Sequence, residues 1–151
     1  MKTAYLDIIS GISGDMTLGA FVSAGVPFDA LKAELAKLPL GGYEITQRTL
    51  MRSMVAAVKI DVTMDAGTHE HHHRGLHDIE DIITGSTLSA SVQQRALDMF
   101  RLLARAEAKV HDTTAEKVHF HEVGAVDSIV DIVGVAICMK MYFFRRRVVH
   151  F

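Results

Sequence analysis

The spacing of apolar residues changes along this chain, and the change limits the folds open to it. Over residues 28–38 the leucines recur every three or four positions, which predicts an amphipathic helix. Over residues 43–64 apolar and polar residues alternate instead, which predicts half-buried antiparallel strands that turn around Arg52 and Ser53. A chain with both patterns and further helical segments after residue 76 is predicted to be α+β, with a small mixed sheet covered by helices.

Other elements follow from the same patterns. Residues 3–9 are apolar enough for a buried strand, and Asp15 suits the N-cap of a helix that ends near Gly25. Residues 116–124 alternate and predict another strand. Further helices are expected over 76–86, over 89–111 with Ser89 as N-cap, and over 125–141, and the second of these should turn Val92, Ala96, Met99, Leu103 and Ala106 inward.

Composition excludes several classes of protein. The 151 residues suffice for one domain with a buried core. Sixteen Lys and Arg against eighteen Asp and Glu leave a net charge of −2, which argues against nucleic acid or membrane partners despite three arginines at 145–147. The single cysteine, Cys138, excludes an internal disulfide, and the lack of a secretory signal favours a cytoplasmic location. The apolar stretch 129–139 is too short to span a membrane.

Histidines concentrate in one internal stretch without apolar periodicity, which we expect to form a mobile loop over residues 65–75. Five of them lie within nine positions: His69, His71, His72, His73 and His77. Imidazole suits Ni(II), Zn(II), Cu(II) and Co(II), and a flexible backbone permits several coordination geometries. The spacing does not match a closed structural zinc site, which favours metal loading and release. The alternative is an exposed polar loop that binds metals incidentally.

A second group of candidate ligands lies in the stretch VHFHEVGAVDSIVD. On a strand, His119 and His121 would share one face, with Glu122 directly after them. On the following helix, Asp127 and Asp131 stand four residues apart and would share a face that is otherwise apolar. Such a pair is costly to bury without a cation or donors, which argues for a site. The alternative is that Asp127 only complements the helix dipole and that Asp131 is exposed.

A third candidate site is the turn between the first strand and the first helix. Asp7 ends the strand, and the turn supplies Gly11, Ser13, Gly14 and Asp15 at a helix N-terminus, where free N–H groups can bind phosphate or carboxylate. The turn lacks the lysine of a Walker loop and does not match a dinucleotide-binding motif. Asp7 and Asp15 are equally consistent with plain capping roles.

Taken together, three stretches resemble the LarC family of nickel-insertion proteins: LDIISGISGDMTLGAFVSAGVP, HEHHHRGLHDI and KVHFHEVGAVDSIVDIVG. Their order and spacing also match, and the resemblance covers residues 3–138. It implies a nickel chelatase of the lyase class that inserts Ni(II) into pyridinium-3,5-bisthiocarboxylic acid mononucleotide. The product is the nickel-pincer nucleotide cofactor of lactate racemase, whose apoprotein would be the recipient. The metal bonds to two sulfurs and a ring carbon, with CTP hydrolysis required.

The resemblance also implies roles for the candidate residues. The histidine-rich loop would collect nickel and surrender it to sulfur donors. His119, His121 and Glu122 would receive or position the metal, and one of them would accept the ring proton. The turn from Ser10 to Asp15 would bind phosphate or carboxylate groups of the mononucleotide.

One departure from the family lies at the end of the chain. Members continue into a second region that looks responsible for the CTP site with its Mn(II) or Mg(II), whereas residues 139–151 do not resemble the family. We therefore expect residues 1–138 to form the family's amino-terminal domain and the tail to be truncated or out of frame. The chain would bind nickel but need a separate carboxy-terminal partner for full activity, and homo-oligomerisation is left open.

Two other functions remain as alternatives. A non-catalytic nickel store or metallochaperone explains the histidine run but gives no function to the stretch VHFHEVGAVDSIVD. A metal-dependent hydrolase of phosphate esters would use a hard-metal site. Its ligands would be Asp7, Asp15, His119, His121, Asp127 and Asp131.

Overall fold

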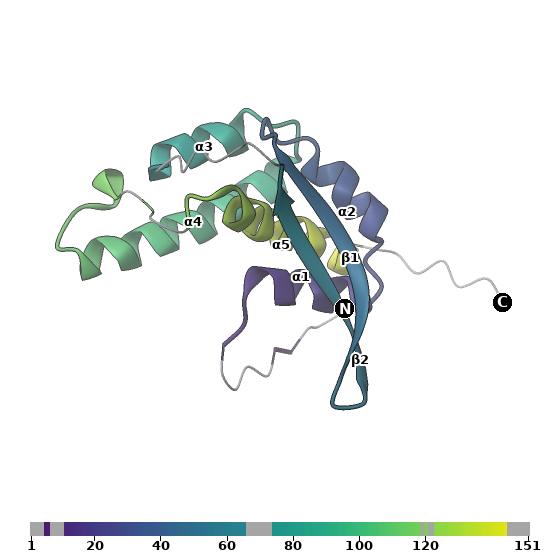
Figure 1. The fold of residues 1–151 in the computed structure, drawn as a ribbon. Helices are drawn as coiled ribbons and strands as arrows, with labels where there is room; N and C mark the ends of the chain where they lie inside the picture. The colour runs from purple at the N-terminus through teal and green to yellow at the C-terminus, as the bar shows by residue number, and fades with distance from the viewer. Residues whose placement is uncertain (1–4, 7–10, 66–73, 119, 121–122, 145–151) are drawn as a thin grey trace.

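Helices and one β-hairpin make up the computed structural model, which describes residues 5–6, 11–65, 74–118, 120 and 123–144 (Figure 1). Among these residues the predicted α+β class is confirmed. The elements are α1 (Gly14–Ser23), α2 (Phe28–Leu35), β1 (Tyr43–Arg52), β2 (Val55–Met64), α3 (Leu76–Thr84), α4 (Ala90–Val110), the short 3-10 helix η1 (Ala115–Lys117) and α5 (Val126–Phe144). Of the buried strand expected over 3–9 the structure describes only Tyr5 and Leu6, which belong to no strand and are exposed, so the prediction is wrong for these two residues. The histidines at 69–73 lie outside the described residues.

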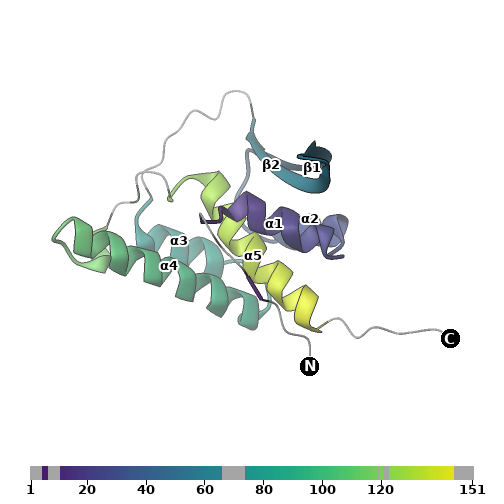
Figure 2. The same ribbon diagram turned by 90° about the horizontal axis from the view of Figure 1, so that it is seen from below.

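Helix α5 is the centre of the molecule. It packs against α1 and α2 on one side and α4 on the other, while the hairpin lies beyond α1 (Figure 2). Its sequence is apolar nearly all round, as a helix enclosed by neighbours must be. The fully buried members include Ile129, Val130, Val133 and Ile137, each at most 1% exposed. Burial of each such side chain contributes roughly 1.5–3 kcal/mol.

The hairpin confirms the predicted strand pair. β1 and β2 pair antiparallel from Tyr43 opposite Met64 to Arg52 opposite Val55. The two residues between them, Ser53 and Met54, have φ of 48° and 63°. Both therefore lie in the left-handed region that a two-residue turn of type I′ requires, because that turn matches the twist of the strands.

The inward face of α4 agrees with the predicted one at buried Val92 and Ala96 and at half-buried Met99, and differs from it further along the helix. Apart from Leu97, its buried residues follow steps of four, at Val92, Ala96, Phe100, Ala104 and Ala108, whereas the prediction placed Leu103 and Ala106 inward. Both of those are exposed. Four residues turn the helix by about 400°, which is slightly more than one full turn. A buried face that follows every fourth residue therefore rotates slowly around the helix axis. This rotation follows the neighbours of α4, which are α3, α5 and η1.

The strand expected over 116–124 is wrong for the residues that the structure describes there. Lys117 ends the 3-10 helix η1, and Val118 and Phe120 belong to no strand. Both side chains are nonetheless buried, and the ring of Phe120 lies 6.5 Å from that of Phe100 on α4. The apolar residues of the alternating stretch therefore pack inward, and Phe120 does so against a helix without joining a sheet.

None of the described helices has the length and apolar character needed to cross a membrane.

Candidate functional site

The first helix begins directly against the central helix. The N-cap of α1 is Ser13, whose carbonyl accepts the backbone N–H of Thr17 at 3.0 Å, so Asp15 lies in the first turn and the prediction that it is the N-cap is wrong. Gly14 has no room for a side chain, because a Cβ there would lie 2.7 Å from Oδ2 of Asp131 and 2.8 Å from its Cγ. A glycine is therefore required for α1 to approach α5 this closely.

The start of α1 packs against the carboxylate of Asp131. The backbone N–H of Asp15 hydrogen bonds to its carboxylate, so Asp131 acts as a cap supplied from another helix. Its Oδ1 atom is buried and has no hydrogen-bond partner among the described residues. Burial, followed by the charges of Asp15 and Asp127, raises the pKa of Asp131 to about 6. The alternative expectation that Asp131 is exposed is therefore wrong.

Asp127, one turn earlier, differs in its surroundings. It is exposed in the first turn of α5, and its Oδ1 accepts the backbone N–H of Ser128 at 2.7 Å. This is the ordinary position of a carboxylate that complements the positive end of a helix. The described residues contain no group of three or more His, Cys, Asp or Glu side chains placed to hold a metal ion.

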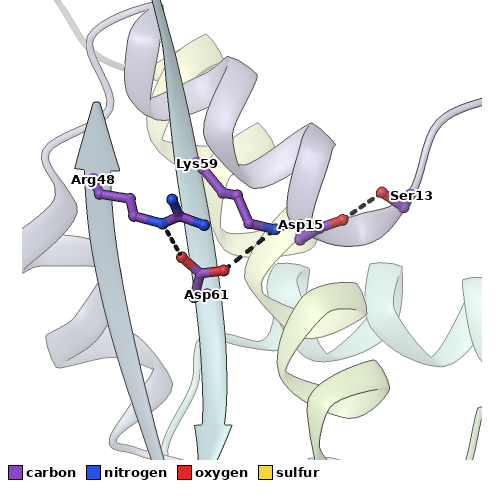
Figure 3. A network of polar contacts seen from close by, with 5 residues as sticks. All are labelled: Ser13, Asp15, Arg48, Lys59 and Asp61. Atoms are coloured by element: carbon purple, nitrogen blue, oxygen red, sulfur yellow. Dashed lines mark hydrogen bonds and ion pairs between the residues drawn. The ribbon is translucent and has the colours of Figure 1, made fainter. Parts of the chain in front are cut away.

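A chain of charged groups connects the start of α1 to the hairpin (Figure 3). The Ser13 hydroxyl donates to Asp15, and Lys59 Nζ lies 3.4 Å from Asp15 Oδ2. Lys59 Nζ also lies 3.2 Å from Asp61 Oδ1, and Arg48 Nε donates to Asp61 Oδ2 at 2.8 Å. The Ser13 hydrogen bond is the largest effect on Asp15 and, with Lys59, lowers its pKa despite partial burial. Asp15 is therefore a carboxylate, charged at neutral pH, beside the less acidic Asp131.

The hairpin contributes residues to this site that the sequence did not predict. Lys59 and Asp61 are two apart in β2, so their shared face was readable from the sequence. Their approach to Asp15, 44 positions from Lys59, depends on how α1 packs on β2 and leaves no local signal.

The other predicted site residues are placed as follows. His77 lies on α3 with its side chain 84% exposed, 3.7 Å from Asp81. Gly11 has φ of 95° and nothing within 4 Å of where a Cβ would stand. The remaining ones lie outside the described residues: Asp7, Ser10, His69, His71, His72, His73, His119, His121 and Glu122.

Arg74, which directly follows the histidine run, contacts the stretch VHFHEVGAVDSIVD. The guanidinium of Arg74 donates from Nη1 to the carbonyl oxygen of Gly124 at 3.0 Å. The carbonyl oxygen of Arg74 accepts the backbone N–H of Phe120 at 3.3 Å. In the sequence, residues 69–73 directly precede Arg74, and His119 and His121 flank Phe120. Two stretches that carry candidate metal ligands are thus connected at Arg74.

These features define a class: an α+β domain with a carboxylate pair at a helix junction and two histidine-bearing stretches tied by a backbone contact. Imidazole and carboxylate together suit a divalent transition metal.

The similarity to known proteins is specific. The family model described as "Nickel insertion protein" matches residues 4–150, and the chain belongs to this family. A relative from Geobacillus kaustophilus is 49% identical over 146 residues, covering 92% of this chain and 36% of the relative. Relatives from Desulfitobacterium hafniense (strain DSM 10664 / DCB-2) and Lactiplantibacillus plantarum are 49% and 47% identical, covering 91% and 93% of this chain and 33% and 38% of the relatives.

All three relatives are named pyridinium-3,5-bisthiocarboxylic acid mononucleotide nickel insertion protein. The chain spans about a third of the length of these curated relatives. No solved structure matches it.

Proposed function

We propose that this chain takes part in the insertion of Ni(II) into pyridinium-3,5-bisthiocarboxylic acid mononucleotide, as the nickel-binding part of a chelatase. The observation that carries the proposal is the similarity over more than nine-tenths of the chain to relatives named for this reaction. Nickel is the cargo of the reaction. The protein must therefore hold it strongly enough to collect it and weakly enough to release it.

The histidines at 69–73 and His77 are the proposed collecting ligands. Imidazole binds Ni(II) well but yields it to two anionic sulfur donors of the substrate. The exposure of His77 supports this role, because a loading ligand has to meet free metal.

His119, His121 and Glu122 are proposed to act at the reacting carbon. When that carbon bonds to nickel, its C–H bond breaks and the proton needs an acceptor. A neutral imidazole or a carboxylate within hydrogen-bonding distance serves as that base. The Arg74 contact supports a joint action of these residues with the histidine run, because it connects the two stretches.

The junction of α1 and α5 is proposed to bind the organic substrate. The turn residues Ser10, Gly11, Ser13 and Gly14 would hold its phosphate or thiocarboxylate groups through backbone N–H donors. Asp131, with Asp127 nearby, would approach the positively charged pyridinium ring or the incoming metal. The buried Oδ1 of Asp131 supports this, because no described residue hydrogen bonds to it. The positive charge of Lys59 would offset the negative charge of Asp15, so that Asp15 does not repel the anionic substrate.

CTP dependence and its Mn(II) or Mg(II) are proposed for the polypeptide that the relatives have in addition. Since this chain spans about a third of their length, the complete reaction is expected to need that further region.

The test is an insertion assay that follows the mass of the nickel-bound mononucleotide. It combines Ni(II), CTP, this chain and the remaining region of the Geobacillus kaustophilus relative, supplied as a separate polypeptide. Changing His119 and His121 to alanine should abolish product, and changing the five histidines of the run should slow it at limiting nickel. Nickel bound without any product in the complete system would instead indicate a store, and cleavage of a generic phosphate ester would indicate a hydrolase.

A further inference from the structure

The hairpin leaves one of its two edges uncovered in the described part of the chain. The edge of β2 lies against α1, because a Cβ at Gly19 would overlap the carbonyl oxygen of Val58. Strand β1 runs for ten residues without a proline, a lysine or a bulge, which are common means of protecting an exposed edge. Among the described residues, its one hydrogen bond to a helix joins the Tyr43 hydroxyl to the Leu35 carbonyl at 3.4 Å.

The register of the hairpin determines which backbone groups of β1 face outward. A two-residue turn is closed by a hydrogen-bonded pair, here Arg52 with Val55, and the following pairs alternate between bonded and non-bonded. The Asp65 N–H donates to the Gly42 carbonyl at 2.9 Å, which continues this alternation at the other end. The odd-numbered residues of β1 therefore direct their N–H and C=O groups away from β2. No described residue hydrogen bonds to these groups at positions 45, 47, 49 or 51.

The outer face of β1 is complementary to itself in one antiparallel register. With Arg48 opposite Arg48 of a second copy, Glu44 lies opposite Arg52 of that copy, and Arg52 lies opposite its Glu44. All three side chains are exposed, and opposite charges in directly facing pairs stabilise a sheet. The like charges at the centre are offset, because each Arg48 donates to its own Asp61 at 2.8 Å. Sliding the strands by two residues in either direction would remove both ion pairs.

We propose that the β1 edge binds the β1 edge of a second copy of this chain, so that the two hairpins form one continuous antiparallel sheet. The outward groups of Gln47 bond to those of Thr49 in the second copy, and the outward groups of Ile45 bond to those of Met51. The Met51 side chain, 65% exposed in the single chain, gains an apolar neighbour. The proposal is independent of the proposed function, because it involves neither metal nor substrate.

Disulfide cross-linking of the whole chain tests the register. The native Cys138 is fully buried, so an engineered cysteine in β1 is the accessible thiol. Arg48→Cys would place two Cα atoms about 4.5 Å apart, a separation that suits a disulfide. Thr46→Cys is the matched control, since its two copies would lie four positions apart, or about 13 Å. With oxidised glutathione, Arg48→Cys should give a covalent dimer on a non-reducing gel, and Thr46→Cys should not.

Sedimentation equilibrium tests the charge pairs and the backbone pairing. The wild type should dimerise reversibly, and Glu44→Arg should raise the dimer Kd roughly tenfold. Adding Arg52→Glu to Glu44→Arg should restore dimerisation, because the facing charges are again opposite. Gln47→Pro should also weaken the dimer, since its N–H faces outward and is not needed for the pairing with β2. Thermal unfolding is recorded to confirm that each variant is folded.

A wild-type chain that stays monomeric up to about 1 mM, or a dimer whose Kd is the same in Gln47→Pro, would overturn the proposal. Equal cross-linking of Arg48→Cys and Thr46→Cys would overturn it too, because the predicted register separates them. The remaining region of the Geobacillus kaustophilus relative is tested as another occupant. If it binds the monomeric chain and loses this binding in Gln47→Pro, the edge pairs with that region and not with a second copy.

Discussion

At Asp131, burial and two neighbouring carboxylates act in the same direction on the pKa, which rises from an ordinary 3.8 to about 6. Between these two values the folded protein binds more protons at this group than the unfolded chain does. The free energy of unfolding therefore falls as the pH rises through that window, and the penalty is complete above about 6.

Replacement of Asp131 by asparagine tests this reasoning. Asn keeps an oxygen that can accept the Asp15 N–H but removes the charge. The variant should be stabilised by about 1 kcal/mol relative to the wild type at a pH of about 7.5, and the difference should shrink towards pH 4. Denaturant unfolding at the two pH values measures this. A stabilisation that is the same at both, or largest in acid, would mean that Asp131 is not strained by its charge.

Gly14 makes a second prediction at the same contact. An alanine there would meet the Asp131 side chain inside van der Waals distance, so α1 has to move away from α5. The expected cost is about 1–3 kcal/mol of unfolding free energy, as for other overpacked sites. Gly41→Ala is the control, because nothing lies near its added methyl group. Equal stabilities for the two variants would contradict the close approach.

Among the elements, α3 and α4 are joined by the side-chain amide of Gln93 and by an ion pair between Arg101 and Glu80 at 2.7 Å. Gln93 on α4 donates from Nε2 to the carbonyl oxygens of Ile83 and Ser86, each at 3.1 Å. Ile83 lies in the last turn of α3 and Ser86 just after it, where carbonyls have no partner further along the helix. The Ile83 carbonyl also accepts the Ser86 hydroxyl at 2.6 Å. The sequence favoured both helices but had no signal for the bond between them.

Gln93→Ala should lower the free energy of unfolding by about 1–3 kcal/mol, because it removes the amide donor of the Ser86 carbonyl, whereas the Ile83 carbonyl keeps the Ser86 hydroxyl as a donor. Its neighbour Gln94 provides the control, since its amide bonds only to exposed Asp98 at 2.8 Å. Thermal or urea unfolding of both alanine variants gives the comparison. A loss in Gln94→Ala as large as in Gln93→Ala would show that helix propensity, and not the bond, sets the effect.

The spacing of apolar residues predicted secondary-structure elements better than it predicted which elements pack together. It identified the hairpin and its turn, because alternation and a two-residue turn are local properties. It misassigned Leu103 and Ala106 on α4, because the buried face follows neighbours that the sequence does not name. Around Phe120 it predicted a strand, whereas this side chain packs against the ring of Phe100 on α4.

At the scale of the whole molecule, the sequence indicated residue types of the candidate site but not how the fold brings those residues together. Asp131 was singled out because a carboxylate on an apolar helix has to be compensated or protonated. Its contact with Gly14 and the link through Lys59 to Asp61 depend on the packing of three elements. The same holds for Arg74, whose partner Gly124 is 50 positions away.

This chain is also expected to bind nickel without completing the reaction by itself. Curated relatives named for the insertion are nearly three times as long, and CTP use is proposed for their additional region. Mixing the chain with Ni(II), CTP and substrate should give no nickel-bound product, whereas adding the additional region should restore it. Full turnover by the chain alone would contradict this division.

The most direct test of the account is calorimetric titration of Ni(II) into the untagged protein and into a variant with the five histidines of the run changed to alanine. His77 is exposed, so its replacement should not disturb the fold. We predict that the wild type binds Ni(II) tightly and that the variant loses this binding, with Kd raised by roughly 10- to 100-fold or more. Unchanged affinity and stoichiometry in the variant would contradict the claim that the run collects nickel, and would place the metal elsewhere.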